Sequence, residues 1–194
     1  RIRGQAPPTT RAALTGTVDY YLARTAHGST LSRVVHASVL ARLDPARGWV
    51  TFRDALAADL DDTQGGTTQE GIHLGAMAGT IDILSRSFAG LETEGATIVL
   101  DPALPAGLHT LEFRMQHRGQ RLAIMIDDDT VTVTAEPCTT RTRVRLRLGE
   151  HEGALQPGTR RIFRRGVGTW HPQETIEVEH EPARPRRRIE GSGP

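Results

Sequence analysis

The chain has 194 residues, of which 37% are hydrophobic and 24% charged, and its 24 basic and 23 acidic side chains leave a net charge of +1. That length fits one large domain or two small ones with a packed core. No apolar run approaches the about 20 residues of a membrane-spanning helix. The single cysteine, Cys138, excludes an internal disulfide framework. The balanced charge argues against a dedicated nucleic-acid-binding protein.

Lysine and asparagine are both absent from the sequence, so every basic residue is an arginine. Without lysine there is neither a Schiff-base lysine nor a phosphate-loop lysine, which excludes two classes of enzyme. The sequence begins at Arg1, with no initiating methionine and no signal peptide. We therefore expect a piece of a longer, cytoplasmic protein.

Residues 1–11 contain a Pro-Pro pair and are expected to be a disordered lead-in. Residues 12–90 have helical patterning, with apolar residues recurring at spacings of three and four from Val34 to Leu43. Asp44-Pro45 ends that helix and opens the next, whose inner side is expected to run from Trp49 to Leu60.

A third helix is expected after a polar, glycine-containing segment. Thr67 followed by Glu70 fits a capping box, so this helix is expected to begin at Thr67. Small residues, including Gly75 and Gly79, recur along it and indicate a close approach of its neighbours.

After Gly90 the period of the pattern changes to two, in short segments that end in turn residues. This pattern predicts a small antiparallel β-sandwich over residues 91–165. Residues 166–194 are expected to be a partly disordered extension, because the chain becomes rich in Pro and Arg from about Glu181. The strands expected from the alternation are 97–100, 111–115, 121–126, 131–133 and 144–148.

Charge is uneven along the chain. Residues 54–101 hold nine acidic residues and one arginine, whereas residues 139–165 hold eight arginines and two glutamates. Alternating arginines are typical of the solvent-facing side of strands, and a polyanion-binding surface is the alternative. Few aromatic residues interleave with these arginines, so stacking on nucleic-acid bases has little support.

Two polar turns, at residues 24–32 and 65–73, combine glycine, hydroxyl residues and a histidine. Each is expected at a helix N-terminus, where unpaired backbone N–H groups and the helix dipole attract anions. Glycine lets an anion approach the backbone, and hydroxyl groups add donors. Ser and Thr at such places also act as ordinary caps, so an anion site and simple capping both fit these residues.

The histidines and carboxylates near these turns have structural explanations as well. His27 lies in the first turn, His73 is expected one turn inside its helix, and His36 is expected to be a core residue with satisfied polar atoms. No two histidines have zinc-motif spacing, which argues against a metal site. Glu70 and the aspartates before the second turn fit capping or solvation, so none is assigned as a general acid.

These residues resemble glycoside hydrolase family 65, which holds maltose, trehalose, kojibiose and nigerose phosphorylases and some related hydrolases. The resemblance rests on Tyr20-Tyr21, on 24–32 (RTAHGSTLS) and on 62–80 (DTQGGTTQEGIHLGAMAGT), and it covers roughly residues 15–165. Residues 101–105 (DPALP) resemble the start of the family's C-terminal β-domain. The family often has an acidic residue and a second serine where this chain has Gly28 and Thr30, which leaves the substrate open.

The resemblance implies an α+β chain that contains the last helices of an (α/α)6 barrel, followed by a small antiparallel β-sandwich C-terminal domain. It also implies that the general-acid glutamate lies upstream of Arg1, so no catalytic residue is expected here and the chain alone should be inactive. The resemblance places phosphate at Ser29, Thr30, Gly66, Thr67, Thr68 and His73, with His27 and Glu70 as neighbours of the substrate.

The implied activity is an inverting phosphorolysis of an α-glucosyl disaccharide to β-glucose 1-phosphate. Phosphate is already a nucleophile and needs positioning, while the upstream acid protonates the glycosidic oxygen. The expected partners are the disaccharide, phosphate as co-substrate, the upstream part of the same protein and a second copy in a homodimer; no cofactor, membrane or nucleic acid is expected. A family hydrolase of trehalose or a related disaccharide, and a non-catalytic binding or structural fragment, remain alternatives. The absence of a carboxylate from residues 65–68 favours the phosphorylase.

Overall fold

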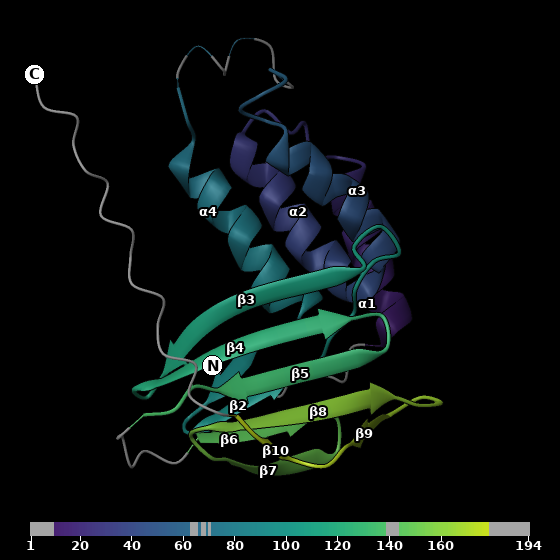
Figure 1. The fold of residues 1–194 in the computed structure, drawn as a ribbon. Coiled ribbons are helices and arrows are strands. Elements are labelled where there is room, and N and C mark those ends of the chain that lie inside the picture. The colour runs from purple at the N-terminus through teal and green to yellow at the C-terminus, as the bar shows by residue number, and fades with distance from the viewer. Residues whose placement is uncertain (1–9, 63–65, 67–68, 70, 139–143, 179–194) are drawn as a thin grey trace, which may run out of the picture.

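The computed structural model describes residues 10–62, 66, 69, 71–138 and 144–178, and it shows a helical half beside a half built of strands (Figure 1). The last of the described α-helices runs directly into a short π-helix that leads to the sheets. The helices are α1 (Arg11–Leu22), α2 (Thr30–Leu43), α3 (Pro45–Leu56), α4 (Leu74–Asp82) and the π-helix η2 (Ile83–Phe88).

The described strands form two sheets, one in the order β1-β2-β6-β7 and one in the order β10-β8-β5-β4-β3, with β9 paired to β8. The pairings are antiparallel except that of β2 with β6, which is parallel. This arrangement confirms the α+β class expected from the sequence. The strands are β1 (Glu92–Glu94), β2 (Thr97–Leu100), β3 (Thr110–His117), β4 (Gln120–Asp127), β5 (Thr130–Ala135), β6 (Val144–Leu148), β7 (His151–Leu155), β8 (Thr159–Arg165), β9 (Trp170–Pro172) and β10 (Ile176–Glu177).

The core between the sheets follows the period-two pattern. Alternate residues of β2, β4, β5 and β6 are buried, as Leu122 and Ile124 are on β4, and Leu146 and Leu148 on β6. Successive side chains of a strand point to opposite faces, so one face of each sheet packs inward and the other meets solvent. The alternation therefore predicted these strands correctly.

Helices and strands of the described residues extend into both the expected lead-in, residues 1–11, and the expected extension, residues 166–194. Helix α1 begins at Arg11, the last residue of the expected lead-in. Strands β9 and β10 both pair with β8, so the sheet continues into the expected extension. Trp170 lies partly buried against the core between the sheets, with the Arg165 guanidinium 4.5 Å from its ring centre.

The break between α2 and α3 lies where the sequence predicts it. Pro45 is the first residue of α3, where its missing N–H costs no hydrogen bond, and the Asp44 carboxylate accepts from the Arg47 N–H at 3.1 Å. The inner face of α2 differs in part from the prediction: Val34 and Leu40 are buried, but Val35 and Val39 are exposed.

The prediction for α3 is wrong in a similar way. Phe52 is buried, whereas Val50, Leu56 and Leu60 are exposed. Apolar residues thus occur on two sides of these helices, and the chain described here covers only one of the sides. The spacing of three and four residues in the sequence could not distinguish these two sides.

Helix α4 begins at Leu74, with His73 as its N-cap, and not at Thr67 as predicted. Gly71 has φ +96°, a left-handed conformation that a right-handed helix cannot include, so the helix starts only beyond it. His73 therefore caps the helix and does not lie one turn inside it. Thr67 and Glu70, the expected capping box, lie outside the described residues.

Helix α4 packs closely against α2, as its small residues predict. A Cβ atom added at Gly79 would lie 2.4 Å from Val34 Cγ1, and one added at Gly75 would lie 3.8 Å from Leu31 Cδ2. Glycine therefore allows the α4 backbone to touch the side chains of α2 from Gly75 to Gly79.

Aromatic rings pack together within the helical half, and an ion pair joins this half to the sheets. Trp49 stacks on Phe52 at 5.4 Å between ring centres, and Phe88 contacts both rings edge-on. Arg42 of α2 pairs with the Asp101 carboxylate that follows β2. The expectation that Trp49 is a core residue is confirmed by its packing against the helical core.

We predict that Gly79→Ala lowers the free energy of unfolding by about 1–3 kcal/mol, because the new methyl group overlaps the stiff, β-branched Val34. Urea titration of the chain measures the change. Gly16→Ala is the matched control, since Gly16 lies in exposed α1 with no atom within 4 Å of an added Cβ. There alanine should stabilise the helix by about 0.5–1 kcal/mol. Equal effects at the two positions would contradict the close packing of α4 on α2.

Candidate functional site

The two polar turns lie at the same end of the helical half. Helices α2 and α4 lie side by side, and their N-termini both point away from the sheets (Figure 1). The end of the first turn leads into α2 at Thr30, and the end of the second leads into α4 at Leu74. Their positive dipole ends therefore face the same region of the molecule.

The first turn has the geometry of a helix cap. Ser29 is the N-cap of α2, and its hydroxyl oxygen accepts from the Leu31 N–H at 3.3 Å. The Ser32 hydroxyl donates to the Ser29 carbonyl at 2.8 Å, and Ser32 Oγ also lies 3.0 Å from His27 Nδ1. Thr30 is buried. Capping thus accounts for the present contacts of Ser29, and its hydroxyl still lies at the helix end where an anion would bind.

His36 does not behave as the sequence suggests. Its buried Nδ1 atom has no hydrogen-bond partner in the described part of the chain, so the expectation of a satisfied core histidine is wrong. The ring of His27 meets it edge-on at 4.9 Å between centres. Burial, and secondarily the charge of His27, lowers the pKa of His36 from its ordinary value. The imidazole of His36 is therefore neutral at pH 7.

A carboxylate already meets the backbone of the second turn. The Gly66 N–H lies 2.7 Å from each carboxylate oxygen of Asp62. This N–H is one that the family resemblance assigns to phosphate, so a bound phosphate would compete with Asp62 for it. Thr67, Thr68 and Glu70, the other residues assigned here, lie outside the described residues.

His73 is held by Asp59, a residue that the sequence analysis did not select. The Asp59 carboxylate accepts from the His73 backbone N–H at 2.8 Å, and its other oxygen lies 2.6 Å from His73 Nδ1. The Asp59 side chain is only 9% exposed. A signal was present: Asp59 is the one charged residue in the run ALAADL, at residues 55–60. A carboxylate in an apolar run needs a partner.

The two bonds from His73 also act on the charge of Asp59. The hydrogen bond from the ring is the largest influence and the backbone N–H is the second, and together they lower the pKa of Asp59 against the opposing effect of desolvation. Asp59 is therefore ionised across the neutral range.

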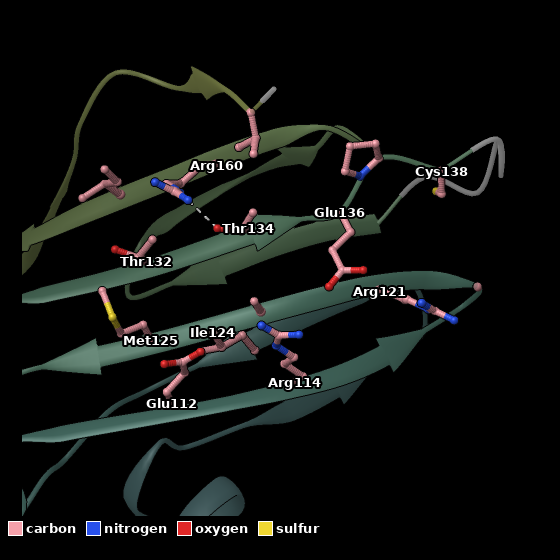
Figure 2. A pocket seen from close by; sticks show the side chains of 15 residues that line it. Glu112, Arg114, Arg121, Ile124, Met125, Thr132, Thr134, Glu136, Cys138 and Arg160 are labelled. Carbon is pink, nitrogen blue, oxygen red and sulfur yellow. Dashed lines mark hydrogen bonds between the residues drawn. The ribbon is translucent and has the colours of Figure 1, made fainter. Parts of the chain in front are cut away.

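A hollow of the described surface lies elsewhere, on the solvent face of the sheet β10-β8-β5-β4-β3 (Figure 2). It measures about 1030 Å³, and none of its lining residues comes from the helices or the polar turns. Arg114, Arg121 and Arg160 line it together with Glu112 and Glu136, so its charges are mixed. This hollow is separate from the predicted phosphate residues.

The arginines of residues 139–165 do not form one surface in the described part. Arg160 lies at the hollow, where its Nε donates to Thr134 Oγ1 at 3.2 Å. Arg145 and Arg147 lie on the other sheet, where Arg145 pairs with Glu152 at 2.6 Å and Arg147 pairs with Glu94 at 2.8 Å. This division favours the solvent-face interpretation over a polyanion-binding surface.

Within the described residues there is no group of three or more His, Cys, Asp or Glu side chains with the arrangement of a metal site. None of their helices has the length and apolar character that crossing a membrane requires.

Most of the chain matches two domains of one protein family. Residues 7–82 match the central catalytic domain of glycosyl hydrolase family 65, and residues 91–152 match the C-terminal domain of that family. The chain belongs to glycoside hydrolase family 65, which confirms the resemblance seen in the sequence.

Relatives of the chain include phosphorylases. A glycosyl hydrolase of Mycobacterium tuberculosis that is named as uncharacterized is 54% identical over 121 residues, which are 62% of this chain and 9% of that protein. Trehalose 6-phosphate phosphorylase of Lactococcus lactis subsp. lactis is 39% identical over 118 residues, which are 60% of this chain and 15% of that protein. The chain thus spans a small part of the length of these relatives.

A solved structure, named as a kojibiose phosphorylase from the human microbiome, has the same fold with a TM-score of 0.67. It is 22% identical in sequence, and the match covers 81% of this chain and 22% of the other. At that identity the likeness establishes the fold alone, and the fold agrees with a last group of catalytic-domain helices followed by a β-domain.

The Asp59 contact predicts a pH-dependent stability. Because the pKa of Asp59 is lowered in the folded chain, its stabilisation is present above the unfolded carboxyl pKa of about 4 and is lost as the pH falls through the folded value. We expect the stability difference between the unaltered chain and Asp59→Asn to shrink from about pH 5 to about pH 2 in urea titrations. Asp61→Asn, at an exposed neighbour, is the control. A difference that stays constant over this range would contradict the prediction.

Proposed function

We propose that this chain is the C-terminal part of an inverting disaccharide phosphorylase that uses phosphate to cleave an α-glucosyl disaccharide to β-glucose 1-phosphate. The observation that carries the proposal is the meeting of two helix N-termini, those of α2 and α4, at one end of the helical half. Such an end attracts anions. The 39% identity to a trehalose 6-phosphate phosphorylase supports the same activity.

In this proposal Ser29 and Thr30 provide donors from the first turn, and Gly66, Thr67 and Thr68 provide them from the second. His73 provides ring Nε2 at the start of α4. Because Nδ1 holds the proton that is shared with Asp59, Nε2 accepts from a phosphate O–H. These groups orient the phosphate oxygen for attack on the anomeric carbon, on the face opposite to the leaving sugar. Positioning suffices, since phosphate is a nucleophile without further deprotonation. His27 and Glu70 are proposed as neighbours of the bound sugar.

The remaining parts of the reaction are proposed to come from outside the chain. A general-acid glutamate upstream protonates the glycosidic oxygen, and no cofactor other than the co-substrate phosphate takes part. Exposed apolar side chains of α2 and α3, such as Val35 and Val50, are proposed to pack against the upstream helices of the barrel. The chain alone is therefore expected to be inactive. A cytoplasmic homodimer is proposed for the complete protein.

A family hydrolase is the second candidate, and one contact favours it. The Asp62 carboxylate lies at the Gly66 N–H, within the turn proposed for phosphate. In an inverting hydrolase a carboxylate activates water on the face opposite to the leaving group. Asp62 would be the residue to test for that role.

The first test extends the chain upstream through the catalytic domain and supplies trehalose, trehalose 6-phosphate, maltose and kojibiose, each with and without inorganic phosphate. We expect release of β-glucose 1-phosphate, followed by enzymatic assay and NMR of the anomeric proton, only when phosphate is present. Release of free glucose at the same rate without phosphate would support the hydrolase. Turnover by the chain of residues 1–194 alone would contradict the placement of the acid upstream.

The second test changes the charge at the first turn and leaves the helix cap intact. Asn and Asp are similar in size and both cap helices well, so Ser29→Asn and Ser29→Asp differ mainly in one negative charge. In the extended protein, we expect kcat/KM for phosphate to be at least about tenfold lower in Ser29→Asp than in Ser29→Asn, since like charges placed together repel. Ser85→Ala, which removes a hydroxyl of η2 that donates to the Ile81 carbonyl of α4, is the control. Equal values for the two Ser29 variants would contradict a phosphate at this turn.

A further inference from the structure

Asp59 and His73 form a contact that joins two elements across the second turn. Asp59 follows the C-terminal end of α3, and His73 is the N-cap of α4, fourteen positions further along the chain. One carboxylate receives both the backbone N–H and the ring Nδ1 of the same histidine. Every residue proposed for phosphate in the second turn lies between these two positions or is His73 itself.

The double contact fixes more than a single hydrogen bond would. The backbone bond at 2.8 Å fixes the start of α4, and the ring bond at 2.6 Å fixes the rotation of the imidazole about its side-chain torsions. Because a carboxylate only accepts, Nδ1 carries the proton of this bond, which determines the tautomer of the ring. A histidine that binds a ligand through one nitrogen is commonly oriented by a carboxylate at the other.

The Asp59 carboxylate makes more contact with His73 than the backbone of α4 alone requires. Its side chain is 9% exposed and follows an apolar stretch. One acceptor oxygen is enough to hold the His73 backbone N–H. The second oxygen is used on the ring, and the ring of His73 is the group proposed to meet phosphate.

We propose that Asp59 is a positioning residue for phosphate binding: it fixes the imidazole of His73 at the start of α4 before phosphate arrives. This inference rests on the proposed phosphorylase function. Asp59 touches neither substrate nor phosphate and acts through His73. Fixing the ring in advance removes part of the side-chain entropy that phosphate binding would otherwise have to overcome.

The spectroscopic part of the test uses the chain of residues 1–194. Nitrogen-15 NMR of the histidine rings, assigned with His73→Gln, reports which ring nitrogen carries the proton. We expect His73 to be protonated at Nδ1 in the unaltered chain and in Asp61→Asn. In Asp59→Asn we expect a mixture of tautomers, because an amide has one acceptor oxygen where the carboxylate has two. A ring that keeps a single tautomer in Asp59→Asn would overturn the proposal.

The kinetic part uses the extended protein, with phosphate as the varied substrate. We expect Asp59→Asn to raise KM for phosphate about 10–100-fold, by analogy with the loss found in metal sites when a carboxylate that orients a metal-binding histidine is removed. Its kcat at saturating phosphate should change by less than about threefold, because the acid and the sugar site are untouched. In a His73→Ala background the same change should add less than about twofold, since the coupling partner is gone.

The outcomes distinguish a failure of the inference about Asp59 from a failure of the proposed phosphorylase function. If the unaltered extended protein needs phosphate and Asp59→Asn lowers kcat without raising KM for phosphate, Asp59 has a structural role only and the inference is wrong while the phosphorylase stands. If the unaltered protein cleaves its substrate without phosphate, the proposed function fails and the inference fails with it. Asp61→Asn, the control for charge, should match the unaltered protein in both constants.

Discussion

The close contact between α2 and α4 is the constraint on which the arrangement of the candidate site depends. At Gly79 the backbone of α4 lies so near to Val34 that there is no room for a methyl group. A larger residue would move α4 outward and carry its N-terminus away from that of α2. The two polar turns are more than thirty residues apart in sequence. They lie together because α4 has a glycine, Gly79, where it contacts α2.

A second constraint acts at the end of α4 that faces away from the sheets. Asp59 and His73 fix where the helix begins, while Gly79 fixes how near it lies to α2. At the opposite end, the π-helix η2 leads into Phe88, whose ring contacts Trp49 and Phe52. Helix α4 is therefore held at its start, along its length and beyond its end. A rigid helix of this kind suits a site that positions a small anion and performs no chemistry of its own.

Local patterns predicted much of this fold. Alternation located β2 to β6, and Asp44-Pro45 marked the break between α2 and α3, since both depend on neighbouring residues alone. Alternation did not locate β7 or β8, and in β8 only Phe163 is buried. The start of α4 depends on the left-handed φ of Gly71, which the capping pattern at Thr67 concealed. The exposure of Val35 and the pairing of Asp59 with His73 depend on elements distant in sequence, or absent from the chain. No local sequence pattern predicts either of these two features.

The two tryptophans lie in different halves of the molecule. Trp49 stacks on Phe52 where the helices meet the sheets, and Trp170 lies under Arg165 at the far side of the strand-built half. Each half thus has its own fluorophore, and replacing either one by phenylalanine isolates the signal of the other. Fluorescence of such a pair of variants would reveal whether the helices and the sheets lose their structure together or in turn, without any added label.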